Sequence, residues 1–287
     1  MKVKKAVFPV AGFGTRMLPA TKAIPKEMIT LIDKPLIHYA VEEAVNSGIE
    51  QMIFITGRTK RSLEDYFDIN VELNVTLENS GKYDLLEDMR RISEMVDVTY
   101  VRQKKMLGLG NAILCVKDIV RGEPFAVILP DDIILAEKPV TAQLIEQFQK
   151  VKKPVVSLMN IKTEDAHKYG IVEVKETVDD RFYRLGNMVE KPKENPPSDL
   201  AIIGRYIITP DVMDVLENTA PGSGGEIQLT DALKHVAKYN DVYGYGFEGK
   251  RFDCGTKLGL LEATVNYAAA NPELRQGLKD SIKGLNL

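Results

Sequence analysis

The sequence predicts an α/β fold, a Rossmann-like mixed and mainly parallel sheet flanked by helices, with an added antiparallel portion. Three observations support this prediction. Strand-like and helical patterns alternate from residue 5 onward, as they do in parallel sheets with crossover helices. The most hydrophobic run, 124–130, has the length of a fully buried central strand. Beyond residue 169, strand-like runs follow one another without long helices, which indicates antiparallel pairing.

In chain order, the same patterns place each element. Apolar runs predict strands at 5–10, 51–56, 97–103, 124–130, 154–161, 169–175, 182–190, 200–208, 242–247 and 252–256. Helical spacing predicts helices at 35–47, with Gly48 just past the end, and at 61–67, 82–95, 140–151, 257–270 and 272–284. Two more helices are expected after glycine-bearing turns, one beginning at the glycines 108 and 110 and one from Glu226 to about Tyr239.

Composition argues against several classes of partner. A formal net charge of −3 and a pI near 5.8 give no basic face, so nucleic acid is not an expected partner. The apolar run near the N-terminus ends at Pro9, which is too short for a signal peptide or a membrane span, so no membrane association is expected. Cys115 and Cys254 are the two cysteines, too few for a disulfide framework, which indicates a reducing compartment and favours the cytoplasm.

The stretch 7–28 has the features of a phosphate-binding loop that follows a buried strand. Gly12 and Gly14 have no Cβ, so backbone N–H groups can approach a polyphosphate closely. Thr15 adds a hydroxyl donor. Because ligands of open α/β sheets bind at the carboxyl ends of the strands, this loop is expected to lie at the ligand-binding edge.

Two cations in the same loop favour anion binding over an ordinary strand-to-helix turn. Arg16 can hold two phosphate oxygens with its planar guanidinium, and Lys26 adds a mobile positive charge. The spacing disfavours two other nucleotide motifs. Met17 stands where the dinucleotide fingerprint of an oxidoreductase needs a small residue, and the loop lacks the Gly-Lys-Ser or Gly-Lys-Thr of a P-loop ATPase.

Three acidic residues stand at the ends of predicted strands. Asp131 and Asp132 follow the central strand, where a hard cation such as Mg²⁺ would be held against phosphate oxygens. Because adjacent residues of an extended chain point to opposite faces, only Asp131 is expected to bind it directly. A turn or helix-cap role is the alternative for this pair. Asp253 either completes the cation site or caps the helix after Thr256.

Polar residues at other strand ends suit a nucleotide or a sugar. Gln103 has an amide that matches the edge of a nucleobase, and Gly108 lies in the second glycine-bearing turn. On an extended strand Glu190 and Lys191 would point opposite ways, with Lys191 toward phosphate and Glu190 toward hydroxyl groups. A solvated charge pair is the alternative. Glu226 is expected in the first turn of its helix, where it would pair with the helix dipole or accept from a sugar hydroxyl.

These motifs together resemble the sugar-1-phosphate nucleotidyltransferases, and most closely the members that use UTP and glucose 1-phosphate. The matching residues are Gly12–Arg16 with Pro25–Lys26, Gln103, Gly108–Gly110, Asp131, Glu190–Pro192 and Asp253–Gly255. Two stretches are more particular to that branch, 21–28 (TKAIPKEM) and 224–231 (GGEIQLTD). The likeness covers roughly residues 3–270 and departs from the family at Asn111, where His is common.

The resemblance implies a nucleotide-diphospho-sugar transferase fold and Mg²⁺-dependent transfer of a uridylyl group from UTP to glucose 1-phosphate, which gives UDP-glucose and pyrophosphate. It assigns catalysis to Arg16, Lys26, Asp131 and Lys191, and Mg²⁺ binding to Asp131 and Asp253. It assigns nucleotide binding to Ala11, Gly12, Gly14, Thr15, Glu27, Gln103 and Gly108, and sugar binding to Gly170, Glu190, Gly204 and Glu226.

The resemblance also implies one domain over residues 1–287, with a nucleotide-binding half at about 3–135, a sugar-binding half at about 154–255 and C-terminal helices at about 256–287. A homodimer or homotetramer is expected. The residues agree with the chemistry, because a sugar phosphate oxygen is already an anion and needs neither a general base nor a covalent nucleophile. Two alternatives remain, a related thymidylyltransferase and a regulatory homologue that binds a nucleotide sugar without turnover.

Overall fold

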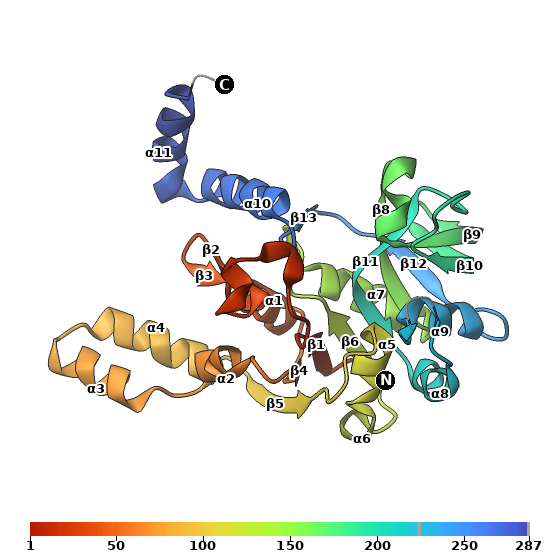
Figure 1. The fold of residues 1–287 in the computed structure, drawn as a ribbon, viewed down its shortest axis with the longest axis horizontal. Helices are drawn as coiled ribbons and strands as arrows, with labels where there is room; N and C mark the ends of the chain where they lie inside the picture. The colour runs from red at the N-terminus through yellow and green to blue at the C-terminus, as the bar shows by residue number, and fades with distance from the viewer. Residues whose placement is uncertain (223–224, 286–287) are drawn as a thin grey trace.

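A nine-stranded sheet forms the centre of the computed structural model, which describes residues 1–222 and 225–285 (Figure 1). Its strands are β1 (Lys5–Pro9), β4 (Gln51–Thr56), β5 (Asp97–Arg102), β6 (Phe125–Ile128), β8 (Val155–Asn160), β9 (Gly170–Asp179), β10 (Phe182–Glu190), β11 (Leu200–Ile208) and β12 (Tyr243–Gly246). They lie in the order β5-β4-β1-β6-β11-β8-β12-β10-β9. Only β10 and β11 run opposite to the rest, so the prediction of a mixed, mainly parallel sheet is confirmed.

Helices cover both faces of this sheet, and their apolar sides form two cores with alternate strand residues. The helices of the described residues, including α3, α4, α10 and α11 that lie away from the sheet, are α1 (Leu36–Val45), α2 (Arg61–Phe67), α3 (Val71–Asn79), α4 (Tyr83–Glu94), α5 (Leu109–Leu114), α6 (Lys117–Val120), α7 (Val140–Val151), α8 (Pro210–Asn218), α9 (Leu229–Val236), α10 (Lys257–Ala270) and α11 (Pro272–Lys283). On β1, Val7 packs into one core and Phe8 into the other, as the two-residue period of a strand requires. In the described ranges 1–222 and 225–285, no helix is long and apolar enough to cross a membrane.

Helix α3 was not expected from the sequence, and its pattern explains why. Its apolar residues stand at alternate positions, Val71, Leu73, Val75 and Leu77, and only Leu77 is buried. The helix begins instead at a cap, because the Asn70 side chain accepts a hydrogen bond from the Leu73 N–H. Together α3 and α4 form a hairpin that projects away from the sheet (Figure 1). Helix α8, which was not predicted either, begins with Pro210.

The helix expected from Glu226 to Tyr239 is shorter than predicted and spans Leu229–Val236. Glu226 therefore precedes the helix and is not in its first turn. Main-chain bonds to the second glycine-bearing turn account for the late start. The Ile227 N–H donates to the Leu107 carbonyl at 2.7 Å, and the Gly110 N–H donates to the Ile227 carbonyl at 2.8 Å. Both main-chain groups of Ile227 are thus engaged outside the helix and the N-cap Gln228 is extended, so the helix begins only at Leu229.

The order of the parallel strands places the predicted loop and the acidic pair at one edge. After β1 the chain pairs β4 and β5 on one side, and it then crosses over to pair β6 on the other side of β1. Such a reversal opens a crevice at the carboxyl ends of the two strands at which it occurs. The loop 10–16 follows β1, and Asp131 and Asp132 follow β6. A second, two-stranded sheet, β7 (Asp132–Leu135) with β13 (Lys250–Asp253), adjoins this crevice.

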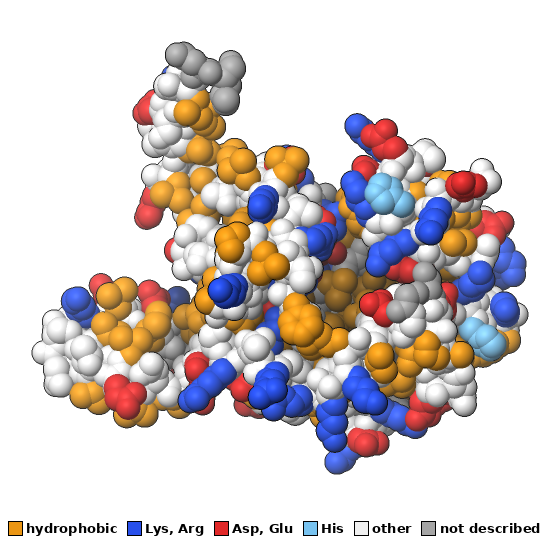
Figure 2. Space-filling model, viewed as in Figure 1, with side chains coloured by type: hydrophobic (Ala, Val, Ile, Leu, Met, Phe, Trp, Pro, Cys, Tyr) orange, Lys and Arg blue, Asp and Glu red, His pale blue; other side chains and the backbone are white. Residues whose placement is uncertain are grey.

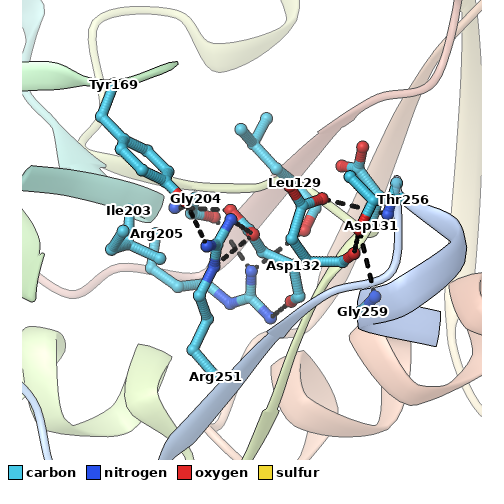
Figure 3. Close-up of polar contacts among 12 residues, drawn as sticks. Leu129, Asp131, Asp132, Tyr169, Ile203, Gly204, Arg205, Arg251, Thr256 and Gly259 are labelled. Carbon is cyan, nitrogen blue, oxygen red and sulfur yellow. Dashed lines mark hydrogen bonds and ion pairs between the residues drawn. The ribbon is translucent and has the colours of Figure 1, made fainter. Parts of the chain in front are cut away.

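A buried ion pair between β11 and α1 fixes the turn that follows β6, and Figure 3 shows its β11 member, Arg205, beside Leu129 and Asp132 of that turn. The Arg205 guanidinium is 1% exposed and donates two hydrogen bonds to Glu43, at 2.9 and 2.7 Å. Its remaining N–H groups donate to the carbonyls of Leu129, Gly204 and Asp132, at 3.0, 3.0 and 2.8 Å. Burial alone would raise the pKa of Glu43, but Arg205 and Thr141 hold it below its usual range.

We expect Glu43→Gln to lower the free energy of unfolding by about 3 kcal/mol or more, because it leaves the Arg205 charge buried without its counterion. Urea unfolding followed by circular dichroism measures the change. Glu50→Gln is the matched control, since Glu50 pairs with Lys4 at 2.8 Å on the surface and its loss should cost at most about 1 kcal/mol. Equal stability of the two variants would contradict the role given to the buried pair.

Candidate functional site

A cleft of about 680 Å³ lies beyond the end of β6, where the first half of the chain meets β9, β10 and β11. Figure 2 shows this face of the molecule hollowed between the first half of the chain and the part that contains β9 and β10, with Lys and Arg side chains around the hollow. Eight of the predicted site residues line the cleft: Arg16, Asp131, Gly170, Glu190, Lys191, Gly204, Glu226 and Asp253. Eight further lining residues that were not predicted as site residues are polar or aromatic: Asp132, Lys168, Tyr169, Tyr206, Gln228, Thr230, Arg251 and Thr256.

Two carboxylates and two cations meet on the side of the cleft that is formed by the loop after β1 and the turn after β6. Lys26 Nζ lies 2.5 Å from Asp131 Oδ2, and Arg16 lies 3.7 Å from the same oxygen and 3.4 Å from Asp253 Oδ2. Burial alone would raise the pKa of Asp131, but Lys26 and Arg16 lower it, so this carboxylate is ionised. Burial would likewise lower the pKa of Lys26, and Asp131 and Glu27 raise it. These charges stabilise one another.

The donor set of Asp131 and Asp253 fits a hard divalent cation. A Cβ built on Gly255 would lie 2.5 Å from Arg16 Nη2, 2.8 Å from Asp131 Oδ2 and 3.0 Å from Asp253 Oδ1, so the two carboxylates and the Arg16 guanidinium converge beside Gly255, whose missing Cβ leaves room for them. Over the described ranges, no group of three His, Cys, Asp or Glu is placed to hold a metal. Two carboxylates suit Mg²⁺, which commonly takes its other ligands from water and substrate phosphates. The helix-cap alternative for Asp253 is wrong, because Thr256 caps α10 with a bond from the Gly259 N–H.

Asp132 faces a different set of partners and is not free to bind a cation. Its Oδ1 accepts from Arg251 Nε at 2.7 Å and also from Nη2, and its Oδ2 accepts from the Gly204 N–H at 3.0 Å. The Gly204 carbonyl is also engaged, by the Leu129 N–H and by Arg205. The main-chain groups of Gly204 are thus engaged within the protein, and its part in sugar binding stays a prediction. Its missing Cβ admits Asp132, whose Oδ2 would lie 2.5 Å from such an atom.

The glycine loop after β1 has the backbone that its sequence requires. Gly14 has φ +67°, and a Cβ on it would lie 2.9 Å from the Lys26 Cβ. Thr21 fixes the loop by donating to the Gly14 carbonyl at 2.8 Å. Gly12 is exposed, and no atom of the described part of the chain lies within 4 Å of a Cβ built on it. Ala11 is buried and Thr15 is the first residue of a short 3-10 helix, and neither lines the cleft.

Gln103 and Gly108 belong to the second glycine-bearing turn and lie outside the cleft lining. The Gln103 amide is 8% exposed and donates to the Asn111 side chain at 3.0 Å. Asn111, the one departure from the family pattern, therefore orients the predicted base contact. Gly108 has φ +94°, and a Cβ on it would lie 2.8 Å from both Glu226 and the Ile227 carbonyl. This close approach joins the predicted nucleotide and sugar residues.

Glu27 does not lie where a direct nucleotide contact would need it. Its side chain is fully buried, and Oε2 accepts from Lys60 Nζ at 2.7 Å. Burial raises the pKa of Glu27, although Lys60 and Lys26 oppose the shift. Glu27 is therefore an internal ion-pair partner of Lys60, a buried residue that sequence reasoning did not find. Lys60 follows β4 by only four positions, at the same sheet edge, which is the signal that could have identified it.

Glu190 and Lys191 do not point opposite ways, which corrects the expectation of an extended strand end. Lys191 has φ +46°, a left-handed conformation that turns its side chain back, and its Nζ lies 3.5 Å from Glu190 Oε1. Glu190 Oε2 accepts from Thr230 at 2.6 Å. Gly170 leaves space for this pair, because a Cβ there would lie 2.9 Å from the Thr230 hydroxyl oxygen. A non-glycine residue in this conformation at a cleft is a mark of function.

Comparison with known proteins decides the family. Residues 5–270 match the sequence profile of the nucleotidyl transferase family. The chain belongs to this family. This nucleotidyl transferase is 46% identical over 285 residues to the UTP–glucose-1-phosphate uridylyltransferase of Bacillus subtilis. The alignment covers 99% of this chain and 97% of that protein.

Two solved structures are similar to this nucleotidyl transferase over almost the whole chain. A UDP-glucose pyrophosphorylase complexed with UDP-glucose has a TM-score of 0.85 at 46% identity, covering 94% of this chain and 100% of that one. A UTP-bound UGPase from Acinetobacter baumannii has a TM-score of 0.91 at 41% identity, covering 99% and 100%. The nucleotide-diphospho-sugar transferase type of fold expected from the sequence is therefore confirmed.

The two glycines 12 and 204 should respond differently to substitution. Gly204→Ala places a Cβ 2.5 Å from Asp132 and should cost about 1–3 kcal/mol in unfolding free energy. Gly12→Ala should change that free energy by less than about 0.5 kcal/mol, because its Cβ meets open space. It should nevertheless weaken nucleotide binding, measured by calorimetry, since that space is where the nucleotide would approach the backbone. A Gly12→Ala protein that binds nucleotide normally would contradict the assignment of the loop.

Proposed function

We propose that this protein transfers a uridylyl group from UTP to glucose 1-phosphate and forms UDP-glucose and pyrophosphate. The observation that supports this most is the cleft, which is lined by Asp131, Asp253 and Arg16 and also by Glu190 and Lys191. Relatives named for this reaction align with the chain over nearly its full length. A pocket that joins a phosphate-binding edge to hydroxyl acceptors suits a nucleotide on one side and a sugar phosphate on the other.

The chemistry needs positioning and charge neutralisation more than proton transfer. A phosphate oxygen of the sugar phosphate forms a bond to the α-phosphorus of UTP, and the bond from that phosphorus to the bridging oxygen of pyrophosphate breaks in line. Arg16 and Lys26 hold the triphosphate and the departing pyrophosphate, while Lys191 holds the sugar phosphate. Asp131 and Asp253 would hold Mg²⁺, which supplies positive charge at the phosphate oxygens when bound. Glu190 and Glu226 accept hydrogen bonds from sugar hydroxyls.

Base recognition is assigned to the second turn and the first loop. Gln103, oriented by Asn111, and the backbone of Ala11, Gly12 and Gly108 would meet the uracil. Gly14 and Thr15 would meet the phosphates. The cytoplasmic location and the homodimer or homotetramer expected from the sequence stay predictions, and light scattering would measure the second.

Pyrophosphate release tests the function and separates the two alternatives. The assay pairs each of the four ribonucleoside triphosphates and dTTP with glucose 1-phosphate and galactose 1-phosphate. UTP with glucose 1-phosphate should be the fastest pair. A faster reaction with dTTP would identify a thymidylyltransferase. Binding of UDP-glucose without any pyrophosphate release would identify a regulatory homologue.

Asp131→Asn should lose roughly 10²-fold or more in turnover, because a neutral amide holds a divalent cation poorly beside a polyphosphate. Steady-state rates over a range of Mg²⁺ concentrations measure the loss, and circular dichroism confirms folding. Asp118→Asn is the control, since Asp118 is an exposed carboxylate in α6 outside the cleft lining. Near-normal turnover of a folded Asp131→Asn protein at ordinary Mg²⁺ concentrations would refute the cation assignment.

Lys191→Ala should lower kcat/KM on the order of 10²-fold, the scale of a lost electrostatic contact to a transition state. A solvated pair with Glu190 would cost almost nothing. Glu190→Ala should instead reduce the preference for glucose 1-phosphate over galactose 1-phosphate, because its partners are hydroxyl groups. Lys193→Ala, an exposed lysine two positions away, is the control for general charge loss. Wild-type kinetics of Lys191→Ala would assign the phosphate to another cation.

A further inference from the structure

Arg251 lines the cleft, as Asp131 and Asp253 do, and has no role in the scheme above. It is on β13, two residues before Asp253, and its side chain is 9% exposed. Because residues two apart on a strand share a face, Arg251 and Asp253 both face the cleft. The alternation of Arg251 and Asp253 with the apolar Phe252 is visible in the sequence. The sequence does not indicate which residue Arg251 contacts.

The partners of Arg251 belong to both sides of the cleft (Figure 3). Nε donates to Asp132 Oδ1 at 2.7 Å, Nη2 donates to the same oxygen, and Nη1 donates to the Tyr169 hydroxyl at 2.9 Å. The guanidinium carbon also lies 5.3 Å from the centre of the Tyr169 ring. A guanidinium fixed by several such contacts can move very little.

The two carboxylates proposed for the cation come from segments that main-chain bonds join only weakly. Asp131 precedes β7 and Asp253 ends β13, and these strands form a two-stranded sheet of four residue pairs, with Asp253 opposite Asp132. Beyond that ladder, the Cys254 N–H donates to the Asp131 carbonyl at 2.8 Å. A two-stranded sheet is marginal by itself. Its register therefore needs side-chain support if the carboxylates are to keep a fixed separation.

We propose that Arg251 is a positioning residue for the divalent cation: by clamping Asp132 from β13, it fixes Asp131 and Asp253 at the spacing that a cation requires. The inference rests on the proposed function for the identity of the site. Residues that orient the ligands of a metal typically change its affinity on the order of 10–100-fold when removed. Arg251 acts through Asp132. It needs no contact with the cation, and none is expected, because both are positively charged.

The test measures Mn²⁺ binding directly. Mn²⁺ is titrated into the full-length protein by electron paramagnetic resonance, once without nucleotide and once with saturating UDP-glucose. Arg251→Met should weaken Mn²⁺ binding roughly tenfold or more. Arg251→Lys keeps the charge and most of the packing but loses the two-point hold on Asp132, so it should weaken binding by a smaller factor and still fold.

Arg184→Met is the matched control. Arg184 is a partly buried arginine on β10 that pairs with Glu176 and Asp241 and does not line the cleft. It should change thermal stability and leave Mn²⁺ affinity as in the wild type. If Arg251 had a purely structural role, its substitution would likewise lower thermal stability but leave the Mn²⁺ affinity of the folded protein unchanged.

The inference is overturned if folded Arg251→Met and Arg251→Lys proteins bind Mn²⁺ as tightly as the wild type. It is also overturned if the wild type binds Mn²⁺ no better than Asp131→Asn. A wild type that binds Mn²⁺ normally but neither binds UDP-glucose nor releases pyrophosphate would refute the proposed function alone, because the titration without nucleotide still compares the Arg251 variants.

Discussion

The buried Arg205 charge is the constraint on which the cleft depends. A guanidinium that is 1% exposed is costly unless every N–H finds an acceptor, and all five of the Arg205 N–H bonds do. Glu43 supplies the counterion, and main-chain carbonyls supply the rest. Two of those carbonyls belong to Leu129 and Asp132, at the two ends of the turn after β6. Both can accept from Arg205 only when this turn has its observed conformation, so the cost of burying the charge is offset in that conformation alone. Asp131 lies inside that turn, so its position is set by the core.

The two neighbouring carboxylates of this turn differ because of what surrounds them. Asp131 faces Lys26 and Arg16, long side chains on a surface loop that a polyphosphate could draw away from it. Asp132 faces Arg251 and a main-chain N–H, neither of which can leave. Burial raises the pKa of Asp132 above its usual value, although the Arg251 charge opposes the shift. One carboxylate is therefore available for ligands, and the other maintains the structure around it.

Much of this could be predicted from the sequence, because it depends on local pattern. Strand and helix periods placed β4, α2, α7 and α10 at their observed bounds, and the strand-end rule placed Asp131 and the loop at Gly12 on one edge. Long-range pairs could not be predicted. Arg205 and Glu43 are 162 residues apart, and Arg251 and Asp132 are 119 apart. Neither the left-handed turn at Lys191 nor the burial of Glu27 has a local signal, since both depend on tertiary contacts.

Strand β11 explains how one cleft serves two kinds of ligand. Its second half pairs with β6, and its first half extends past β6 to pair with β8 and β9. Gly204 and Arg205 lie at the junction, where one admits Asp132 and the other binds Glu43. Gly170 and Glu190, assigned to the sugar, stand on β9 and β10 on one side of β11 in the sheet order, whereas Ala11, Gly12 and Gln103, assigned to the base, follow β1 and β5 on its other side. Substitutions can therefore alter base selectivity or sugar selectivity separately. The residues assigned to the phosphates stay in place, because the junction at Gly204 and Arg205 is shared by both halves of the chain.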